Sequence, residues 1–138
     1  MKKILLALAL IGFNAQAEDV YVFPGYDDVG NEMPKKEIIY TLYTSRPCPL
    51  PIANQKNLKL ADIYNLQRPS KGCWGIALEP TKSQVVVIGE YGSIASDLNL
   101  TNFARAKING SGAYIIQGPA MSPEQYRANV KRYQDSLR

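Results

Sequence analysis

The chain of 138 residues contains no histidine, and this absence argues against several classes of function at once. Histidine is the usual general base of enzymes, the commonest ligand of transition metals and the central member of most serine triads. A phosphate-binding loop and a dinucleotide fingerprint are also missing, because the glycine pair at 89 and 92 lacks the required spacing. We therefore expect a protein that is not an enzyme and uses no cofactor and no metal.

Cysteine is nearly absent too, with only Cys48 and Cys73 in the chain. Two cysteines in an oxidising compartment favour a disulfide, here closing a loop of about 26 residues. The alternative is a pair of free thiols or a reactive cysteine. A cysteine nucleophile usually depends on a histidine base, which this chain does not have. The sequence therefore predicts the disulfide, and pairing would also remove the sulfur ligands of a zinc site.

Long apolar runs are scarce, and the one that stands out is at the N-terminus. Lys2 and Lys3 precede an apolar stretch at 4–13, and a small-residue pattern follows at 15–17. A span of about ten apolar residues is typical of a signal peptide, whereas a membrane-spanning helix needs roughly twenty. We predict a signal peptide at 1–17, a single mature domain at 18–138 and export to a bacterial periplasm. An uncleaved membrane anchor is the alternative.

The charge balance is too weak to indicate a nucleic-acid partner. The chain has 16 basic and 12 acidic residues, and the predicted signal peptide holds two of the basic ones. The mature balance is then 14 minus 12, or +2. A chain that binds nucleic acid normally carries a stronger basic excess, so no nucleic acid is expected.

Trp74 is the only tryptophan and follows Cys73 directly. In a strand the two side chains point to opposite faces, so the indole need not pack on the disulfide. Two interpretations remain open. Trp74 is either a core residue that contributes a large buried area or an exposed aromatic that contacts a partner.

Most of the chain after residue 18 is patterned as short strands between turns. Stretches rich in β-branched and aromatic residues lie at 20–23, 37–44, 58–66, 73–78, 84–89, 93–98 and 113–116. The stretch at 58–66 also fits a helix face. We expect a polar loop at 26–36, irregular backbone at prolines 47, 49 and 51, a hairpin connection at 68–72 and a strand end at 118–119. This spacing is typical of a small antiparallel sheet or barrel.

The last segment has the signals of a helix. Ser122 suits the N-cap, Pro123 the first helical position and Gln125 the third. Tyr126, Val130, Tyr133 and Leu137 follow at helical spacing. The predicted fold is therefore mainly β (α+β), with one disulfide and a C-terminal helix at about 122–136 packed across the sheet.

Candidate partner-binding residues lie in the predicted loop and helix. Tyr26, Asp27 and Asp28 belong to the loop, and Arg127 and Lys131 form a basic face on the helix. Tyrosine is favoured at protein interfaces, but it is also ordinary in exported β proteins. The basic face is either solvated, where it offsets the helix dipole, or it docks on an acidic protein or an anionic membrane surface.

The only acidic cluster in the sequence lies in the same loop. Asp27 and Asp28, with Glu32, are either solvated turn carboxylates or an acid–base pair for glycoside hydrolysis. With Asn31 they could also offer oxygens to calcium, although the alternating ligands and fixed glycine of the recognised loop are missing.

Several short motifs occur in a characteristic order. Thr44 precedes Pro47-Cys48, a Gly-Cys-Trp segment follows at 72–74, then the valine-rich stretch 85–88, a Glu90–Gly92 turn, a leucine at 98 or 100, and Phe103. In these motifs the chain resembles a family of small exported proteins of tailed phages and prophages of proteobacteria. The resemblance covers the middle half of the chain and departs from the family before Glu37 and after Phe103. It implies a disulfide-linked β module of phage or mobile-element origin, and it implies no activity.

These observations favour a non-enzymatic periplasmic protein that binds an envelope protein. Lysis control, superinfection exclusion and inhibition of a cell-wall hydrolase are the roles that a phage origin suggests. Two alternatives remain open: a carbohydrate-active enzyme that uses the loop carboxylates, and a structural module of a larger assembly.

Overall fold

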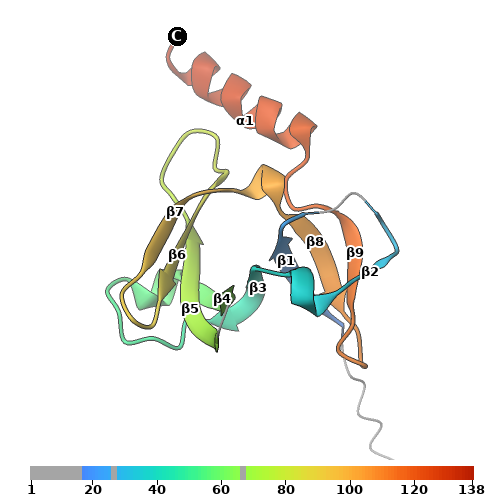
Figure 1. The fold of residues 1–138 in the computed structure, drawn as a ribbon. Coiled ribbons are helices and arrows are strands. Elements are labelled where there is room, and N and C mark those ends of the chain that lie inside the picture. The colour runs from blue at the N-terminus through green and yellow to red at the C-terminus, as the bar shows by residue number, and fades with distance from the viewer. Residues whose placement is uncertain (1–16, 26–27, 66–67) are drawn as a thin grey trace, which may run out of the picture.

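The computed structural model describes residues 17–25, 28–65 and 68–138 of the chain. Within these ranges, a single nine-stranded antiparallel sheet is followed by one helix, α1, at Pro123–Ser136 (Figure 1). The mainly β fold with one disulfide and a C-terminal helix is therefore confirmed, and the sheet is open. No helix within the described ranges is long and apolar enough to cross a membrane.

The strands follow one another along the chain with short connections. Their bounds are β1 Glu18–Phe23, β2 Glu32–Met33, β3 Tyr40–Pro47, β4 Lys59–Asn65, β5 Arg68–Ile76, β6 Gln84–Gly89, β7 Ile94–Asn99, β8 Ala104–Ile108 and β9 Tyr114–Pro119. The described part of the chain also has 3₁₀ turns at Lys35–Glu37, Gln55–Asn57 and Leu100–Asn102.

The order of strands in the sheet is β2-β9-β8-β1-β3-β4-β5-β6-β7. Strands β3 to β7 form a meander, as expected from the regular turn spacing. The first strand breaks this pattern, because β1 lies between β3 and β8. Val20 is opposite both Tyr43 of β3 and Ala106 of β8. The N-terminal strand therefore joins the meander to the C-terminal strands.

Both faces of the sheet carry a core. On β1, Val20 and Val22 belong to one cluster, whereas Tyr21 and Phe23 pack against the other, as strand alternation requires. The first cluster draws on β2, β8 and β9 through Met33, Ala104, Ala106, Tyr114 and Ile116. The second draws on β5, β6 and the chain after β7 through Trp74, Val85, Val87, Leu100, Phe103 and Met121. The two ends of the sheet thus cover opposite faces of its centre.

The predicted disulfide is present. Cys48 and Cys73 are bonded, with their Cα atoms 5.2 Å apart, and both side chains are buried. The bond ties the loop after β3 to β5, and the Gln55 amide donates to the Cys48 carbonyl at 2.9 Å. The loop that the disulfide closes contains β4, so the link fixes β4 between its two neighbours.

Several predicted boundaries were wrong. The expected polar loop at 26–36 contains the two-residue strand β2, which pairs with β9. The expected hairpin connection at 68–72 belongs to β5, which begins at Arg68. Prolines also sit inside strand ends, since Pro47 closes β3 opposite Lys59 and Pro119 closes β9 opposite Ala104. Proline lacks a backbone N–H and cannot donate to the ladder, but at a strand terminus this loss leaves the rest of the ladder intact.

Strand β8 was not predicted. Its small apolar residues, Ala104 and Ala106, are buried and alternate with exposed Arg105 and Lys107. Alanine, lysine and arginine have little intrinsic preference for strands, so local sequence gave no signal. Residues 104–108 form a strand because they pair with β1 on one side and with β9 on the other.

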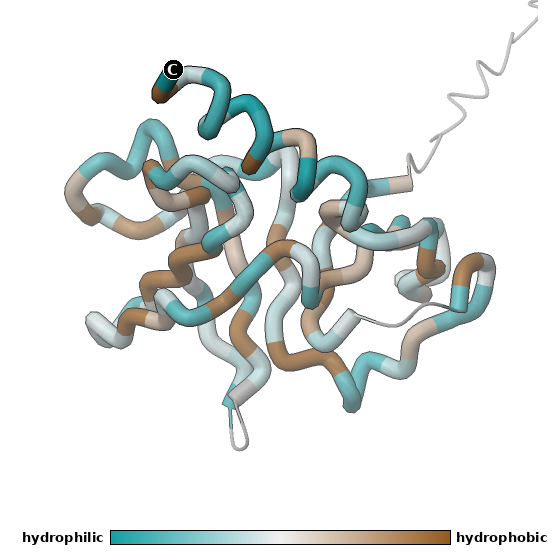
Figure 2. Tube along the Cα trace, turned by 90° about the horizontal axis from the view of Figure 1, so that it is seen from above, coloured by the Kyte–Doolittle hydropathy of each residue, from teal (hydrophilic) through white to brown (hydrophobic). Residues whose placement is uncertain are grey.

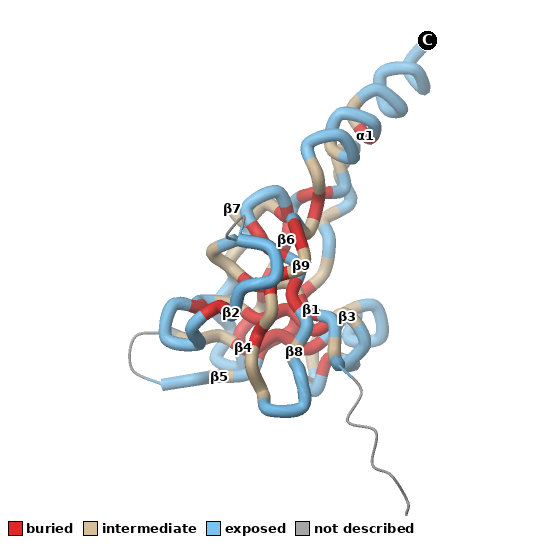
Figure 3. The backbone as a smooth tube through the Cα atoms, turned by 90° about the vertical axis from the view of Figure 1, so that its right-hand side faces the viewer, coloured by how far each residue is buried: buried red, intermediate tan, exposed pale blue. Residues whose placement is uncertain are grey.

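The expectation that the helix packs across the sheet was also wrong. The Ser122 hydroxyl accepts from the backbone N–H of Gln125 at 3.1 Å, so the predicted N-cap is present. Tyr126 packs against the second cluster, and the Asn129 side chain donates to the Thr81 carbonyl at 2.7 Å. From residue 131 onward every residue is exposed, and α1 extends away from the sheet (Figure 3). Most of its surface is hydrophilic (Figure 2), so there is little apolar area to draw it onto the sheet.

Candidate functional site

The predicted binding loop is only partly described. Tyr26 and Asp27 lie outside the described residues, and Asp28 is exposed. Asp28 lines a small open pocket of about 200 Å³ with Asn31, Glu32 and Glu37. In the described part of the chain no three metal-ligating side chains come close enough to hold an ion. The calcium interpretation includes Asp27, which lies outside the described residues, so it stays a prediction.

Trp74 lies in the core and not on a surface. Trp74 is 5% exposed, and its indole N–H donates to the Tyr43 carbonyl at 2.9 Å. The ring meets Tyr21 edge-on, with ring centroids 5.9 Å apart. A side chain enclosed in this way is not available to a partner, and the structure favours the core interpretation of the two that the sequence left open.

Arg127 and Lys131 are exposed on α1, apart from the other predicted residues. Each forms an ion pair within the helix, Arg127 with Glu124 at 3.3 Å and Lys131 with Asp135 at 2.5 Å. Exposed pairs at these spacings contribute a few tenths of a kcal/mol, about 0.3–0.5, to a helix. Among the candidates that the structure describes, Asp28, Trp74 and the basic helix face are thus not brought together into one site.

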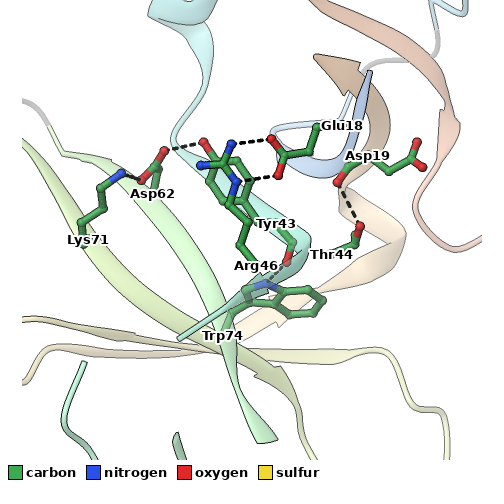
Figure 4. Close-up of polar contacts among 8 residues, drawn as sticks. All are labelled: Glu18, Asp19, Tyr43, Thr44, Arg46, Asp62, Lys71 and Trp74. Carbon is green, nitrogen blue, oxygen red and sulfur yellow. Dashed lines mark hydrogen bonds and ion pairs between the residues drawn. The ribbon is translucent and has the colours of Figure 1, made fainter. Parts of the chain in front are cut away.

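A polar network lies at the centre of the sheet (Figure 4). The Asp62 carboxylate accepts from the Tyr43 hydroxyl at 2.8 Å and from the Lys71 ammonium at 2.5 Å. Arg46 lies over the Tyr43 ring, 4.5 Å from its centroid, and donates through Nε and Nη2 to both carboxylate oxygens of Glu18, each at 2.6 Å. The network therefore joins β1, β3, β4 and β5 through their side chains.

This network cross-links neighbouring strands. Burial, and then the hydrogen bond to Asp62, raise the pKa of Tyr43, so the phenol stays protonated. Asp62 is buried and both of its oxygens already accept from neighbours. Both oxygens of this carboxylate are thus engaged by side chains of the neighbouring strands β3 and β5.

An apolar groove lies on the second face of the sheet. It has a volume of about 530 Å³ and is lined by Ile39, Tyr40, Ile63, Tyr64, Val87, Ser93, Ile94 and Ala95. One wall comes from the start of β3 and from β4, and the other from β6 and the start of β7. We call it the hairpin groove, because the β6–β7 hairpin forms one side.

Exposed apolar side chains stand on the rim of the hairpin groove. Ile94 is 69% exposed and Ile39 is 44% exposed, and Tyr91 at the tip of the adjoining hairpin is 90% exposed. Single exposed apolar residues are common, but neighbouring ones around an open apolar groove are typical of an interaction site. The arrangement provides apolar contact area at an open site.

One carboxylate lies close enough to the groove to act on its lining. Burial, and then the charge of Asp97 on β7, raise the pKa of Tyr40. Asp97 itself is exposed. The side of the groove formed by β7 therefore has a negative charge beside an apolar floor.

Sequence reasoning did not single out the residues of the hairpin groove. Ile39 and Ile94 lie in the predicted strands 37–44 and 93–98, and an isoleucine in a strand is expected to be buried. Ile94 is exposed because β7 is at the edge of the sheet, and the sequence does not encode strand order locally.

Comparison of the chain with family models, with curated proteins and with solved structures found no match. The resemblance to phage and prophage proteins therefore stays a prediction from motifs.

Proposed function

We propose that this chain is a non-enzymatic binding protein of the bacterial periplasm that acts on an envelope protein, held in the hairpin groove. The observation that carries the proposal is the open apolar groove of about 530 Å³ with Ile94 and Ile39 exposed on its rim. An exposed apolar surface around a concave site is the usual form of a protein-binding or ligand-binding site.

The rim residues provide enough area to matter. Complete burial of an isoleucine side chain stabilises a complex by about 1.5–3 kcal/mol. Ile94 has 69% of its area exposed, so its burial by a partner contributes about 1–2 kcal/mol. Since about 1.4 kcal/mol corresponds to tenfold in affinity, loss of this one contact should weaken binding by about tenfold.

The compartment follows from the predicted signal peptide, and the disulfide is consistent with it. A bond between Cys48 and Cys73 persists in an oxidising space, which the bacterial periplasm provides. The motifs shared with phage and prophage proteins favour lysis control, superinfection exclusion or inhibition of a cell-wall hydrolase. In each of these roles the protein acts by binding, and no catalytic group is required.

The proposal is tested by retention of a partner from a periplasmic extract on the purified mature protein. The native protein should retain a discrete envelope protein, and Ile94→Asp should lose it. Leu78→Asp is the matched control, because Leu78 is fully exposed and does not line the groove. Equal retention by native protein and Ile94→Asp would overturn the assignment to the groove. Absence of any retained protein would overturn the binding function.

Inhibition of a cell-wall hydrolase can be measured directly with lysozyme. An inhibitor that uses the hairpin groove should slow lysozyme turnover, and Ile94→Asp should restore it while Leu78→Asp does not. Unchanged turnover with the native protein would remove lysozyme from the set of partners.

A further inference from the structure

Strand β7 is an open edge of the sheet. It is the last strand in the order, and among the described residues it pairs only with β6. The opposite edge is β2, which has two residues, whereas β7 has six. An edge strand presents unpaired backbone N–H and C=O groups, and these can pair with another extended chain.

The register shows which backbone groups of β7 are unpaired. The Gly89 N–H donates to the Ser93 carbonyl at 2.8 Å, and Val87 is opposite Ala95. In an antiparallel ladder successive residues turn their backbone groups alternately toward and away from the partner strand. The N–H and C=O of Ile94 therefore face away from β6.

The same rule applies at the other end of β7. The Leu100 N–H donates to the Ser83 carbonyl at 2.8 Å, so the backbone groups of Asn99 face outward. Between these ends the register shifts opposite Val86, where β7 has one extra residue. The open edge thus offers pairing groups at both ends with an irregularity between them.

The hairpin groove lies along this edge. Ile94 and Ala95 of β7 line it, and Ile39 and Tyr40 form the facing wall. A chain added beyond β7 would lie across the mouth of the groove. Because side chains of a strand alternate in direction, every second side chain of the added chain would point into the groove.

Charge indicates the chemistry of the added chain. Residues 83–104 contain two acidic residues, Glu90 and Asp97, and no lysine or arginine. Pairing of β7 with β7 of a second copy would bring two Asp97 carboxylates close together, and like charges on adjacent strands are destabilising. A partner segment with a basic side chain near Asp97 would instead gain an ion pair.

We propose that β7 accepts an extended segment of the partner protein as an additional strand. The segment places alternate apolar side chains in the hairpin groove and a lysine or arginine beside Asp97. Recognition by strand addition draws affinity from backbone hydrogen bonds and specificity from alternate side chains. The inference rests on the proposed function and specifies how the partner is held.

The edge also has features that restrict other pairings. A charged residue and a bulge on an edge strand are common protections against unspecific pairing. Here both Asp97 and the register shift are in β7 itself. A segment must therefore match the bulge and supply a basic side chain.

The experiment uses a random twelve-residue peptide library selected on the immobilised mature protein. The enriched peptides should share apolar residues at every second position and at least one lysine or arginine. Binding of the strongest peptide is then measured by calorimetry. Ile94→Asp should weaken it by at least tenfold, Leu78→Asp should leave it unchanged, and Asp97→Lys should reduce the affinity for basic peptides by at least tenfold.

Strand addition is separated from simple groove binding by N-methylation of the peptide. Methylation of alternate backbone nitrogens removes hydrogen-bond donors and keeps every side chain, and it should weaken binding by at least tenfold in one of the two alternating patterns. Bound peptide should also slow hydrogen exchange of the backbone amides of Ile94 and Asn99.

Asp97→Lys, at an exposed position, serves as a second variant should Ile94→Asp fail to fold.

The outcomes distinguish the two proposals. Equal binding of methylated and unmethylated peptides would overturn strand addition and leave partner binding in the groove intact. Strand addition would also be overturned if the library yields no binder while the native protein retains a partner from the extract and Ile94→Asp does not. If the native protein is a dimer and Ile94→Asp is a monomer, β7 pairs with a second copy of the chain, and the inference would be overturned. Peptide binding unaffected by both Ile94→Asp and Asp97→Lys would overturn it as well.

Discussion

Glu79 organises the turn between β5 and β6, and its replacement by glutamine should destabilise the protein in a pH-dependent way. The carboxylate accepts from the Thr81 and Ser83 amides at 2.7 Å each, from the Gln84 amide at 3.1 Å, and from the Thr81 hydroxyl. The Thr81 carbonyl in this turn accepts from Asn129, so the turn also anchors α1.

The size of the effect follows from the pKa of Glu79. Burial acts to raise this pKa, but the hydrogen bonds outweigh burial and hold it at about 2, against an ordinary value of 4.5. One pKa unit corresponds to about 1.36 kcal/mol, so this difference gives an upper value of about 3 kcal/mol. Solvent screening at this surface turn reduces the expected contribution to about 1–2 kcal/mol.

The sign of the pH dependence is fixed by the lowered pKa. A carboxylate with a depressed pKa in the folded state stabilises that state above the pKa of the unfolded chain. The contribution of Glu79 should therefore be complete above pH 4.5 and should disappear as the pH falls toward 2. Glu79→Gln removes the charge and should lose this contribution at every pH.

The assay is urea unfolding of the native protein and of Glu79→Gln at pH 7 and pH 2.5. The free energy of unfolding should differ by about 1–2 kcal/mol at pH 7, and most of the difference should be gone at pH 2.5. Glu90→Gln, at an exposed glutamate of the next turn, is the control and should change little. A difference below about 0.3 kcal/mol at pH 7, or an equal difference at both pH values, would refute the reasoning.

Three further predictions concern the disulfide, the helix and the polar network. Replacing Cys48 and Cys73 by alanine opens a loop of 26 residues and should lower the free energy of unfolding in urea by about 3.5 kcal/mol; a loss below about 1 kcal/mol would contradict the loop-entropy argument. Removal of the chain after Val130 takes away only exposed residues, so far-ultraviolet circular dichroism should lose helical signal while the melting temperature stays within a few degrees; a large drop would show that the end of the helix packs on the domain. Asp62→Ala leaves the Tyr43 hydroxyl buried without its acceptor and should destabilise by about 2–4 kcal/mol in the same urea assay, whereas a neutral result would mean that the network is not needed.

Local features of the fold were predictable because their signals are local. The N-cap at Ser122, the strand around residues 85–88 and the pairing of Cys48 with Cys73 each depend on a few neighbouring residue types or on a count. The turn expected after residues 58–66 favours a strand over a helix there, and the strand is present as β4.

Features that depend on distant pairing were not predictable in the same way. Strand β8 exists because β1 and β9 flank it, and its alternating Ala104, Arg105, Ala106 and Lys107 indicate no strand by themselves. The exposure of α1 was missed because helical spacing indicates an apolar stripe but not what covers it. Leu137, the last residue of that stripe, is 68% exposed.

The hairpin groove was missed for the same reason. It joins residues of β3 and β4 to residues of β6 and β7, and β7 ends the sheet with Ile94 uncovered, which follows from strand order and not from residue type. Trp74 shows the converse, since a lone tryptophan suggests an interface in the sequence but is enclosed between two strands and Tyr21 in the structure.

The central claim is that a partner contacts the hairpin groove, and cross-linking in the cell tests it most directly. A photoreactive amino acid would be placed at position 94, on the rim of the groove, or at position 78, which is equally open to solvent but outside the groove. Irradiation should yield one discrete adduct with an envelope protein from position 94 and none from position 78. An adduct from position 78 with none from position 94 would contradict the account.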